Sequence, residues 1–471
     1  MTMLNSRTYA PTLLLACVLG ACGPTEEPIE PTEEDPRVAL REVVDELGLA
    51  PIQAPPAQPA GKIELGRALF FDPETSGNRD AACGMCHRMS NATVDGLSLP
   101  VGTKARVMED GARLPGARLR FVPRNVPDLF NRTHPELDTM FWDTRLFRTE
   151  SGDFHLADFS ESYTPAAVLR VMPEGLDNIL AAQNLLPFLN RDELRGVGGD
   201  SDIFGEVNEL ALILDLDFES VWAAVMRRLL AIPAYVALFG EAYPDVAVED
   251  LTIVHAANAL SAFIGNTFAF TDSPWDQYLA GDDDAIDEAA ARGALVFYGK
   301  GQCSVCHSGT LFTDQRFYNI AVPPLGEGPD PEELVDSGAT HRSVAGPESR
   351  FAFRTPPLRN VALTAPYMHN GTYATLEGVI RHKADALTAL RNYDASQIRP
   401  EFQVQVHTSP DVLDAVERTV IPLFARPLDL TERDITDLVA FLESLTDPAA
   451  TELESERPDS VPSGLPVVEP R

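Results

Sequence analysis

The sequence has little positive charge. Its 37 Lys and Arg residues stand against 71 Asp and Glu residues, which gives a formal net charge of −34 at pH 7. So negative a field repels nucleic acid and favours basic partners. Beyond its N-terminal segment, the sequence also has no apolar run long enough to span a bilayer. A nucleic-acid-binding protein and a membrane-spanning domain are therefore excluded, and the 44% hydrophobic content of 471 residues predicts two domains with sizeable cores.

The N-terminal segment predicts export. Arg7 precedes an apolar stretch that ends in small residues before Cys22. Leu19-Gly20-Ala21-Cys22 resembles a bacterial lipobox, so we expect residues 1–21 to be a signal that is removed and Cys22 to carry lipid; a plain secretory signal cut near Ala21 is the alternative. Residues 22–58 are acidic and Pro-rich and predict a solvated tether, within which 38–49 has helical spacing. The expected location is the periplasm, as a membrane-anchored lipoprotein.

Four of the six cysteines lie in two copies of one motif. Cys83-Gly84-Met85-Cys86-His87 and Cys303-Ser304-Val305-Cys306-His307 are both C-x-x-C-H. This is the attachment signal for c-type haem, in which two thiols form thioethers with the haem vinyl groups and the adjacent His binds the iron. A single copy could instead be half a zinc site or a redox dithiol. A zinc site pooled from both copies would leave His87 and His307 without a role, so the pair predicts two covalent haems.

Further motifs flank the two attachment sites. Residues 65–72 and 76–78 (LGRALFFD and SGN) precede the first, and residues 124–131 and 141–145 (RNVPDLFN and FWDTR) follow it. The longest is Phe353 to Gly371, which follows the second site. Together these segments resemble the bacterial di-haem cytochrome c peroxidase and MauG family, with Thr144 in place of a family Gly. The resemblance covers roughly residues 63–448, most of the chain without its signal and tether.

The resemblance implies a fold. It implies a mainly α-helical protein of two cytochrome c-like domains, each with one covalently bound haem. The N-terminal, peroxidatic domain would span residues 59–284 and the C-terminal, electron-transfer domain residues 285–448. Residues 449–471 are acidic and Pro-rich, and they predict a disordered tail.

The resemblance also implies roles for single residues. Asn125, Thr364 and the carbonyl of Pro366 would bind a calcium ion between the domains, and Trp142 would relay electrons between the haems. Gln183 and Glu193 match a Gln and a catalytic Glu of the family, although Leu194 replaces the Met that accompanies them. A carboxylate over the open face of a haem can take a proton from one peroxide oxygen and deliver it to the other.

The sequence departs from the family in the loop that follows the first motif. Many members carry a His there that caps the peroxidatic iron, whereas residues 88–133 contain no His. We therefore hypothesise that the first haem is five-coordinate or water-bound even when oxidised. Other residues that could cap this iron are Met89, Met108, His134 and His155.

The sixth ligand of the second haem is expected in residues 376–383, where the family has Met or Tyr. Lys383 falls about where that ligand should be, but a Lys must first lose its proton, whereas neutral imidazole is a good iron ligand. We therefore predict His382, with Met368 and His369 as alternatives.

The function implied is the reduction of hydrogen peroxide to water. Electrons would come from a small basic donor, such as a cytochrome c or a cupredoxin, and would enter at the second haem. A MauG-like oxidase acting on a protein or organic substrate is one alternative, and a non-enzymatic di-haem electron carrier is another. A homodimer is left open.

Overall fold

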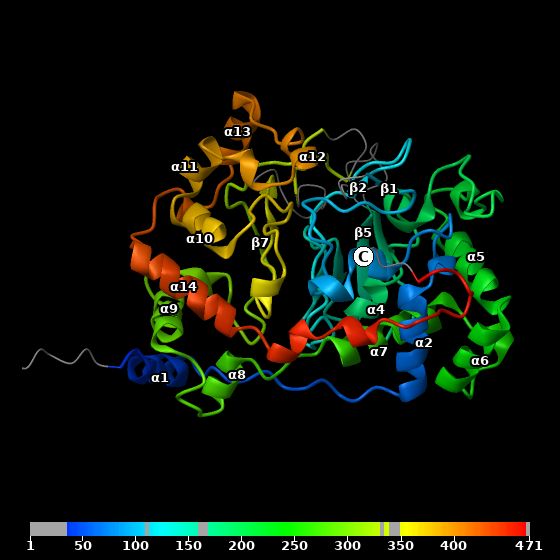
Figure 1. The fold of residues 1–471 in the computed structure, drawn as a ribbon, viewed down its shortest axis with the longest axis horizontal. Helices are drawn as coiled ribbons and strands as arrows, with labels where there is room; N and C mark the ends of the chain where they lie inside the picture. Colours follow the sequence, from blue (N-terminus) through cyan, green and yellow to red (C-terminus); the bar gives the residue numbers. More distant parts are fainter. Residues whose placement is uncertain (1–34, 109–112, 159–167, 330–333, 339–348, 468–471) are drawn as a thin grey trace, which may run out of the picture. The chain divides into compact units, whose positions relative to one another are not determined.

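Helices make up most of the regular structure (Figure 1). The computed structural model describes residues 35–108, 113–158, 168–329, 334–338 and 349–467. The helices are α1 (Pro36–Leu47), α2 (Ala60–Phe71), α3 (Cys83–Cys86), α4 (Ile179–Gln183), α5 (Phe218–Leu230), α6 (Pro233–Ala242), α7 (Ile253–Thr267), α8 (Pro274–Leu279), α9 (Glu288–Tyr298), α10 (Leu376–Ala384), α11 (Ala386–Arg391), α12 (Pro400–Gln403), α13 (Pro410–Glu417) and α14 (Glu432–Ser444). The strands are β1 (Arg106–Val107), β2 (Arg113–Leu114), β3 (Thr139–Met140), β4 (Leu146–Arg148), β5 (Phe154–Asp158), β6 (Val168–Val171), β7 (Phe317–Tyr318) and β8 (Phe353–Arg354). The predicted helical content is confirmed.

A close helix crossing shapes the first hydrophobic core. Where α2 meets α7, a Cβ atom on Gly66 would lie 2.0 Å from the carbonyl oxygen of Ala259 and 2.8 Å from the Cβ of Phe263. Glycine is required because any side chain would push the helices apart. One turn further along α2, the ring of Phe70 packs against Phe263 at a centroid distance of 5.3 Å. Helices α5 and α6 pack on the same core. Together with α7 they hold α2, the helix that leads into the first Cys motif.

The second core repeats this crossing with α9 and α14. A Cβ atom on Gly293 would lie 1.9 Å from the carbonyl oxygen of Asp437 and 2.8 Å from the Cβ of Phe441. Phe297, again four residues after the glycine, packs its ring 5.1 Å from that of Phe441. In each half, the helix that precedes the Cys motif thus crosses a helix from later in the chain in the same way. The domain boundaries at residues 284 and 448 stay a prediction, since residues 36–471 group into one compact unit.

The described part of the expected tether is packed, which differs from the sequence prediction. Helix α1 buries Leu40 and Val44 in the second core. Its Arg41 guanidinium lies 3.8 Å from the centre of the Tyr278 ring. From α1 the chain runs on as an extended segment to α2 (Figure 1), and on the way the backbone N–H of Ile52 donates to Asp276 over 3.1 Å. Residues 1–34, which hold the expected signal and lipid anchor, lie outside the described residues.

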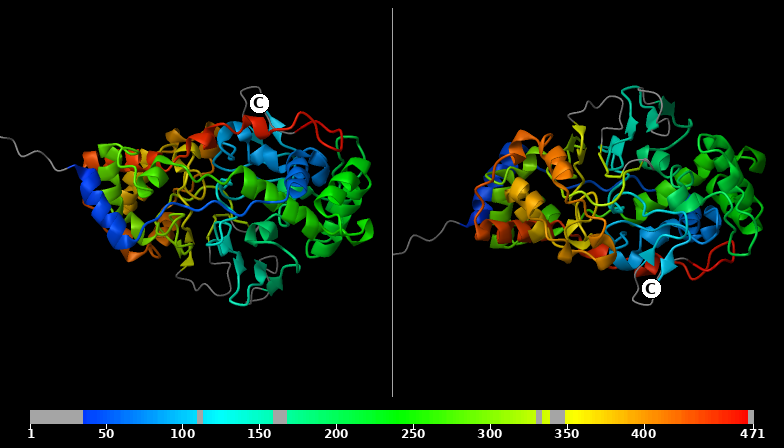
Figure 2. Two further views of the ribbon diagram at one scale, coloured as in Figure 1. Left: turned by 90° about the horizontal axis from the view of Figure 1, so that it is seen from below. Right: turned by 90° about the horizontal axis from the view of Figure 1, so that it is seen from above.

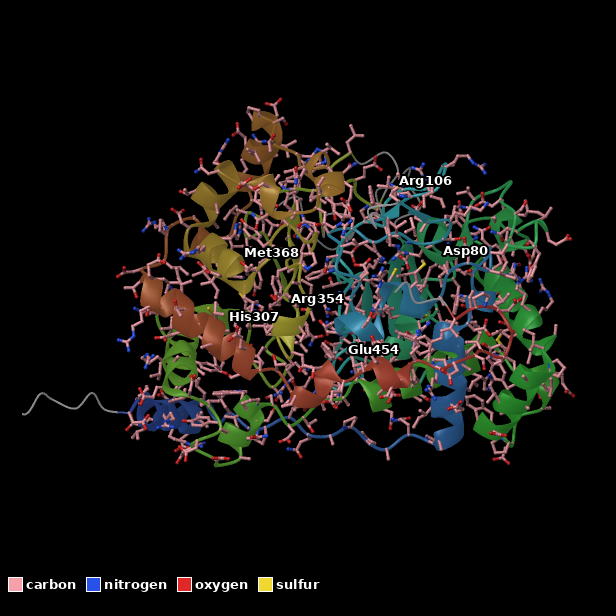
Figure 3. The ribbon with its side chains drawn as sticks, in the orientation of Figure 1. Asp80, Arg106, His307, Arg354, Met368 and Glu454 are labelled. Carbon is pink, nitrogen blue, oxygen red and sulfur yellow. The ribbon has the colours of Figure 1, made fainter. Side chains whose placement is uncertain are left out.

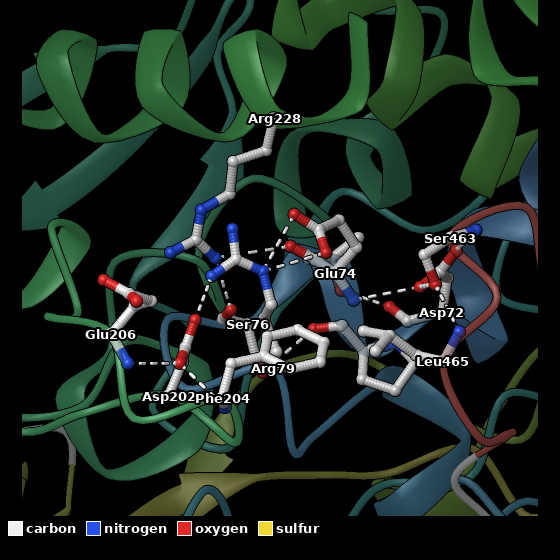
Figure 4. A network of polar contacts seen from close by, with 12 residues as sticks. Asp72, Glu74, Ser76, Arg79, Asp202, Phe204, Glu206, Arg228, Ser463 and Leu465 are labelled. Atoms are coloured by element: carbon white, nitrogen blue, oxygen red, sulfur yellow. Dashed lines mark hydrogen bonds and ion pairs between the residues drawn. The ribbon is translucent and has the colours of Figure 1, made fainter. Parts of the chain in front are cut away.

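The C-terminal segment also differs from the expected disordered tail. Leu453 and Val461 are buried in the first core. The hydroxyl of Ser463 donates to Asp72 over 2.6 Å, and the Ser463 backbone N–H donates to the same carboxylate over 3.0 Å (Figure 4). Composition alone suggested disorder because this segment has few apolar residues. The few that it has are sufficient because they dock on a core that the rest of the chain has already built.

A four-stranded antiparallel sheet in the order β3-β4-β5-β6 carries the segment 141–145 in the turn between β3 and β4. Figure 2 shows this sheet on the opposite side of the molecule from the C-terminal segment. In the second half, β7 pairs with β8 and joins the segment after the second Cys motif to the start of the 353–371 segment.

Within the described residues no single helix has both the length and the apolar character to cross a membrane. Helices α5 and α6 meet both criteria only when taken together, and they are bent by 105°.

Candidate active site and haem-binding residues

The first Cys motif forms one helical turn. Cys83 and Cys86 bound α3, and the backbone N–H of His87 donates to the carbonyl of Cys83 over 2.9 Å. The Nδ1 atom of His87 lies 3.0 Å from the carbonyl oxygen of Thr93. Because a carbonyl can only accept, Nδ1 carries the proton and Nε2 keeps its lone pair. Burial lowers the pKa of His87 to about 4, so the ring is neutral, as an iron ligand must be.

The second Cys motif has the same geometry. The backbone N–H of His307 donates to Cys303 over 2.9 Å, and Nδ1 lies 2.9 Å from the carbonyl oxygen of Phe312. Burial, together with the charge of Lys383, lowers the pKa of His307 to about 3. His307 is buried in the second half of the molecule (Figure 3). Each motif therefore presents a neutral imidazole, and the His307 ring also interacts with the backbone of Pro356.

The four motif thiols are free and separate. Burial raises the pKa of Cys83 and Cys86 to about 12 and that of Cys303 to about 11, so these groups are uncharged thiols. Across the part of the chain that the structure describes, no three or more His, Cys, Asp or Glu side chains are grouped to hold a metal ion. The pooled zinc site considered above is therefore not formed by the described residues, whereas two thiols beside a neutral His fit haem attachment at each motif.

A cavity of about 1000 Å³ opens beside the first motif. Its wall includes Cys83, Cys86 and His87, and it also includes the predicted catalytic residues Gln183 and Glu193. A cavity of this size with a largely apolar wall is typical of a site for a large organic cofactor. The structure thus brings Gln183 and Glu193 to the cavity that His87 faces, although more than 90 residues separate them from it in sequence.

Glu193 is held by its own local structure. It lies in a short π-helical turn, Arg191–Arg195, for which Asn190 is the N-cap. The side-chain oxygen of Asn190 accepts from the backbone N–H groups of Asp192 and Glu193, and its amide nitrogen donates to Glu193 Oε1 over 2.8 Å. Burial raises the pKa of Glu193 to about 7, against the lowering effect of the Arg145 charge. A carboxyl group with this pKa can both accept and release a proton near neutral pH.

Sequence reasoning missed two residues of this site, Arg145 and Asn190. Arg145 lines the cavity, lies 4.0 Å from the centre of the Phe141 ring and donates to Asp143 over 3.2 Å. It ends the segment 141–145, so a cation within a matched motif was the available signal. Asn190 could have been found as an N-cap residue three positions before a Glu.

Trp142 and the predicted calcium ligands lie on another part of the same cavity wall. Trp142 Nε1 donates to the backbone carbonyl of Asn125 over 2.9 Å, and the Trp142 carbonyl accepts from the backbone N–H of Arg354 over 2.7 Å. Trp142 is therefore bonded to segments from both halves of the chain. Asn125, Thr364 and Pro366 all line the cavity, and their role as calcium ligands stays a prediction.

The expected caps of the first haem do not line the cavity. Met89 is buried in the first core, Met108 is exposed directly after β1, and neither His134 nor His155 reaches the cavity wall. Apart from His87, no histidine that the structure describes lines it. This arrangement supports an open first haem, which stays a hypothesis.

His382, the predicted sixth ligand of the second haem, is engaged elsewhere. Its Nδ1 atom lies 2.8 Å from the Tyr373 hydroxyl, and its Nε2 atom lies 2.8 Å from the carbonyl oxygen of Ile320. Both ring nitrogens are thus hydrogen-bonded inside the protein, and the choice of His382 needs correction. The sequence could not show this, because the partners come from outside helix α10.

The alternatives to His382 have surroundings of their own. Met368 lines the first cavity, and the ring of His369 stacks on Phe353 at a centroid distance of 3.3 Å. By contrast Lys383, the next residue of α10, interacts electrostatically with the second motif. Burial raises the pKa of both Cys303 and Cys306, and the positive charge of Lys383 opposes that rise.

Residues 60–284 match the family model of the di-haem cytochrome c peroxidases. The methylamine utilization protein MauG of Methylorubrum extorquens is 27% identical over 396 residues, which cover 83% of this chain and 80% of the relative. The cytochrome c551 peroxidase of Pseudomonas aeruginosa is 27% identical over 318 residues, which cover 67% of this chain and 70% of the relative.

Solved structures show the same fold. A MauG-like protein associated with microbial copper homeostasis superposes with a TM-score of 0.56 at 24% identity, over 87% of this chain and 97% of the other. The diheme peroxidase BthA from Burkholderia thailandensis superposes with a TM-score of 0.53 at 22% identity, over 84% of this chain and 88% of the other.

Proposed function

The chain belongs to the di-haem cytochrome c peroxidase and MauG family, and we propose that it reduces hydrogen peroxide to water with electrons from a small redox protein. The observation that carries this proposal is Glu193, a carboxyl group with a pKa of about 7 in the wall of the cavity that the first Cys motif also lines. A mere electron carrier has no use for a proton-transfer group at this place.

The two Cys motifs would hold the cofactors. Cys83, Cys86 and His87 would bind the first haem, and Cys303, Cys306 and His307 the second. When bound, the haems supply the electrons and the iron at which the oxygen–oxygen bond of peroxide is cleaved.

Glu193 would move the proton. In its ionised form the carboxylate takes a proton from one oxygen of peroxide and then gives it to the other oxygen, which leaves as water. Two electrons and two protons complete the conversion of one peroxide into two waters. Asn190 holds Oε1 of Glu193 in place, and the charge of Arg145 favours the ionised form that begins the cycle. Gln183, in the same cavity wall, would orient the peroxide.

Electrons would enter at the second haem and pass by way of Trp142. The net charge of −34 favours a basic donor, such as a small cytochrome c or a cupredoxin. The Trp142 indole supports this role because it lines the first cavity while the residue's backbone is bonded to β8 in the second half. A calcium ion bound by Asn125, Thr364 and the Pro366 carbonyl would stabilise the segments around Trp142.

Export belongs to this proposal. Haem attachment of this type takes place outside the cytoplasmic membrane, so the protein would be periplasmic and anchored by a lipid on Cys22.

A MauG-like oxidase is the second candidate. The absence of a second His from the described wall of the first cavity favours it, since an uncapped iron can react with peroxide without prior reduction. Here the electrons would come from a protein or organic substrate.

One experiment separates these functions. Peroxide is added to the oxidised and to the pre-reduced di-haem protein, each with and without reduced cytochrome c. Rapid oxidation of cytochrome c supports the peroxidase. A long-lived oxidised spectrum without turnover supports the MauG-like enzyme and refutes the peroxidase. If no arm reacts with peroxide, both enzymes are refuted and the protein is an electron carrier.

A further inference from the structure

Lys383 is placed differently from its neighbour His382. Successive residues of an α-helix point about 100° apart. Because His382 is held by Tyr373 and the Ile320 carbonyl, Lys383 of the same helix must point another way. Leu376 and Ile380 of the same helix are buried in the second core, and Cys303 packs against that core. Lys383 follows Ile380 by three positions, so it lies on the same face of the helix. This face of α10 therefore meets the core that holds the second Cys motif, and the Lys383 charge opposes the rise in pKa that burial causes at Cys303 and Cys306.

The Lys383 amine has no partner that would explain its burial. Within the described residues it makes no ion pair and no hydrogen bond, and its recorded contact is the Phe424 ring, 5.4 Å away at the centroid. Other buried cations have polar partners: Arg124 lies 2.7 Å from Asp336 and Arg359 lies 2.7 Å from Asp276, whereas Arg113 and Arg354 donate to backbone carbonyls. A mostly buried amine without a counter-ion is unfavourable unless it binds something that the protein chain itself does not supply.

We propose that Lys383, as a neutral amine, is the sixth ligand of the iron of the second haem. This proposal rests on haem attachment at Cys303, Cys306 and His307, which is part of the function proposed above. The lysine would give its nitrogen lone pair to the iron opposite His307, and the proton of the ammonium form would pass to solvent. No electron is transferred in this step, and the vacant or water-bound position of the iron is filled.

Amine ligation has consequences that methionine ligation would not have. A second nitrogen ligand keeps the iron low-spin, and it gives a lower reduction potential than the Met/His pair, which raises it. The second haem would then be a stronger electron donor to the first.

The test uses the complete di-haem protein. In wild-type protein labelled with ¹⁵N only in lysine, electron–nuclear double resonance of the oxidised second haem should show coupling to a lysine nitrogen. Lys383→Ala should turn that haem high-spin, and added imidazole should restore the low-spin spectrum. Lys383→Met should produce a methionine–iron charge-transfer band and raise the potential of the second haem.

The control is Lys300→Ala, which removes an exposed lysine paired with Asp434 near the same motif. It should leave the spectrum unchanged. Absence of lysine coupling in the wild-type protein, or an unchanged low-spin spectrum in Lys383→Ala, overturns the proposal. The labelling arm needs no variant, so it decides the question even if the variants do not fold. Lysine coupling in a protein that does not turn over peroxide would refute the proposed function while leaving this ligand assignment intact.

Discussion

Replacing Glu193 by Gln should abolish turnover and at the same time stabilise the fold at alkaline pH. Glutamine keeps the size of the side chain and an oxygen that can accept from Asn190. It cannot take a proton from peroxide. General acid–base groups contribute roughly 10²- to 10⁴-fold to a rate, so we expect peroxide turnover to fall by about that factor.

The size of the stability change follows from the raised pKa. Burial moves the Glu193 pKa from its ordinary value of 4.5 to about 7. Below pH 4.5 the carboxyl is protonated in both the folded and the unfolded chain, and it has no effect on the pH dependence. Between these values the unfolded chain ionises first, so stability is lost as the pH rises. Above pH 7 the loss is complete and amounts to at most about 3 kcal/mol, less whatever water in the cavity screens.

Two measurements check this prediction. Peroxide turnover with reduced cytochrome c should rise through about pH 7 in the wild-type protein and lose that step in Glu193→Gln. Denaturant unfolding should show Glu193→Gln more stable than the wild-type protein at pH 8 and nearly equal to it at pH 4.5. Glu249→Gln, at an exposed position, is the matched control. The reasoning is refuted if Glu193→Gln keeps more than about a tenth of the activity, or if it is destabilised at pH 8.

Three further predictions test other parts of the structure. Trp142→Phe should slow electron delivery from reduced cytochrome c in stopped-flow experiments. Trp222→Phe is the control, because it also loses an indole hydrogen bond to a backbone carbonyl but should leave the rate unchanged. Equal rates in the two variants would contradict the relay role of Trp142. Asp276→Ala leaves the buried Arg359 without its carboxylate and should lower the free energy of unfolding by about 3–5 kcal/mol, and a loss below 1 kcal/mol in denaturant titration would show that the pair is dispensable. Leu453→Ala removes a buried anchor of the C-terminal segment and should destabilise the protein by about 2–5 kcal/mol; an unchanged unfolding midpoint would mean that the segment is undocked in solution.

Several residues of the matched motifs turn out to be structural. Arg124 is buried between Asp143 and Asp336, at 2.6 Å and 2.7 Å, and so ties the segment 124–131 to the segment 141–145 and to the second half. Asp72 accepts from Tyr235 and from Ser463 (Figure 4). A motif match therefore locates the site, but it does not by itself distinguish the residues that react from those that stabilise the fold.

Much of each haem-attachment site could be predicted from the sequence because its parts are local. Two thiols and a His within five residues suffice to name the cofactor, and the carbonyls that orient the two His rings lie only five and six residues further on. Glu193 is likewise fixed by Asn190, three residues before it. Short-range geometry of this kind follows from the chain itself, whatever the remaining fold.

Only the tertiary structure decided what depends on surfaces from distant segments. It brought Glu193 into the cavity of the first motif, and burial there raises its pKa to about 7. It docked α1 on the second core and the C-terminal segment on the first, where composition had suggested a tether and a tail. It also bonded His382 to Tyr373 and to the Ile320 carbonyl, so that Lys383 points another way. Sequence places these two residues one position apart, and the choice between them depends on how α10 is rotated against its neighbours.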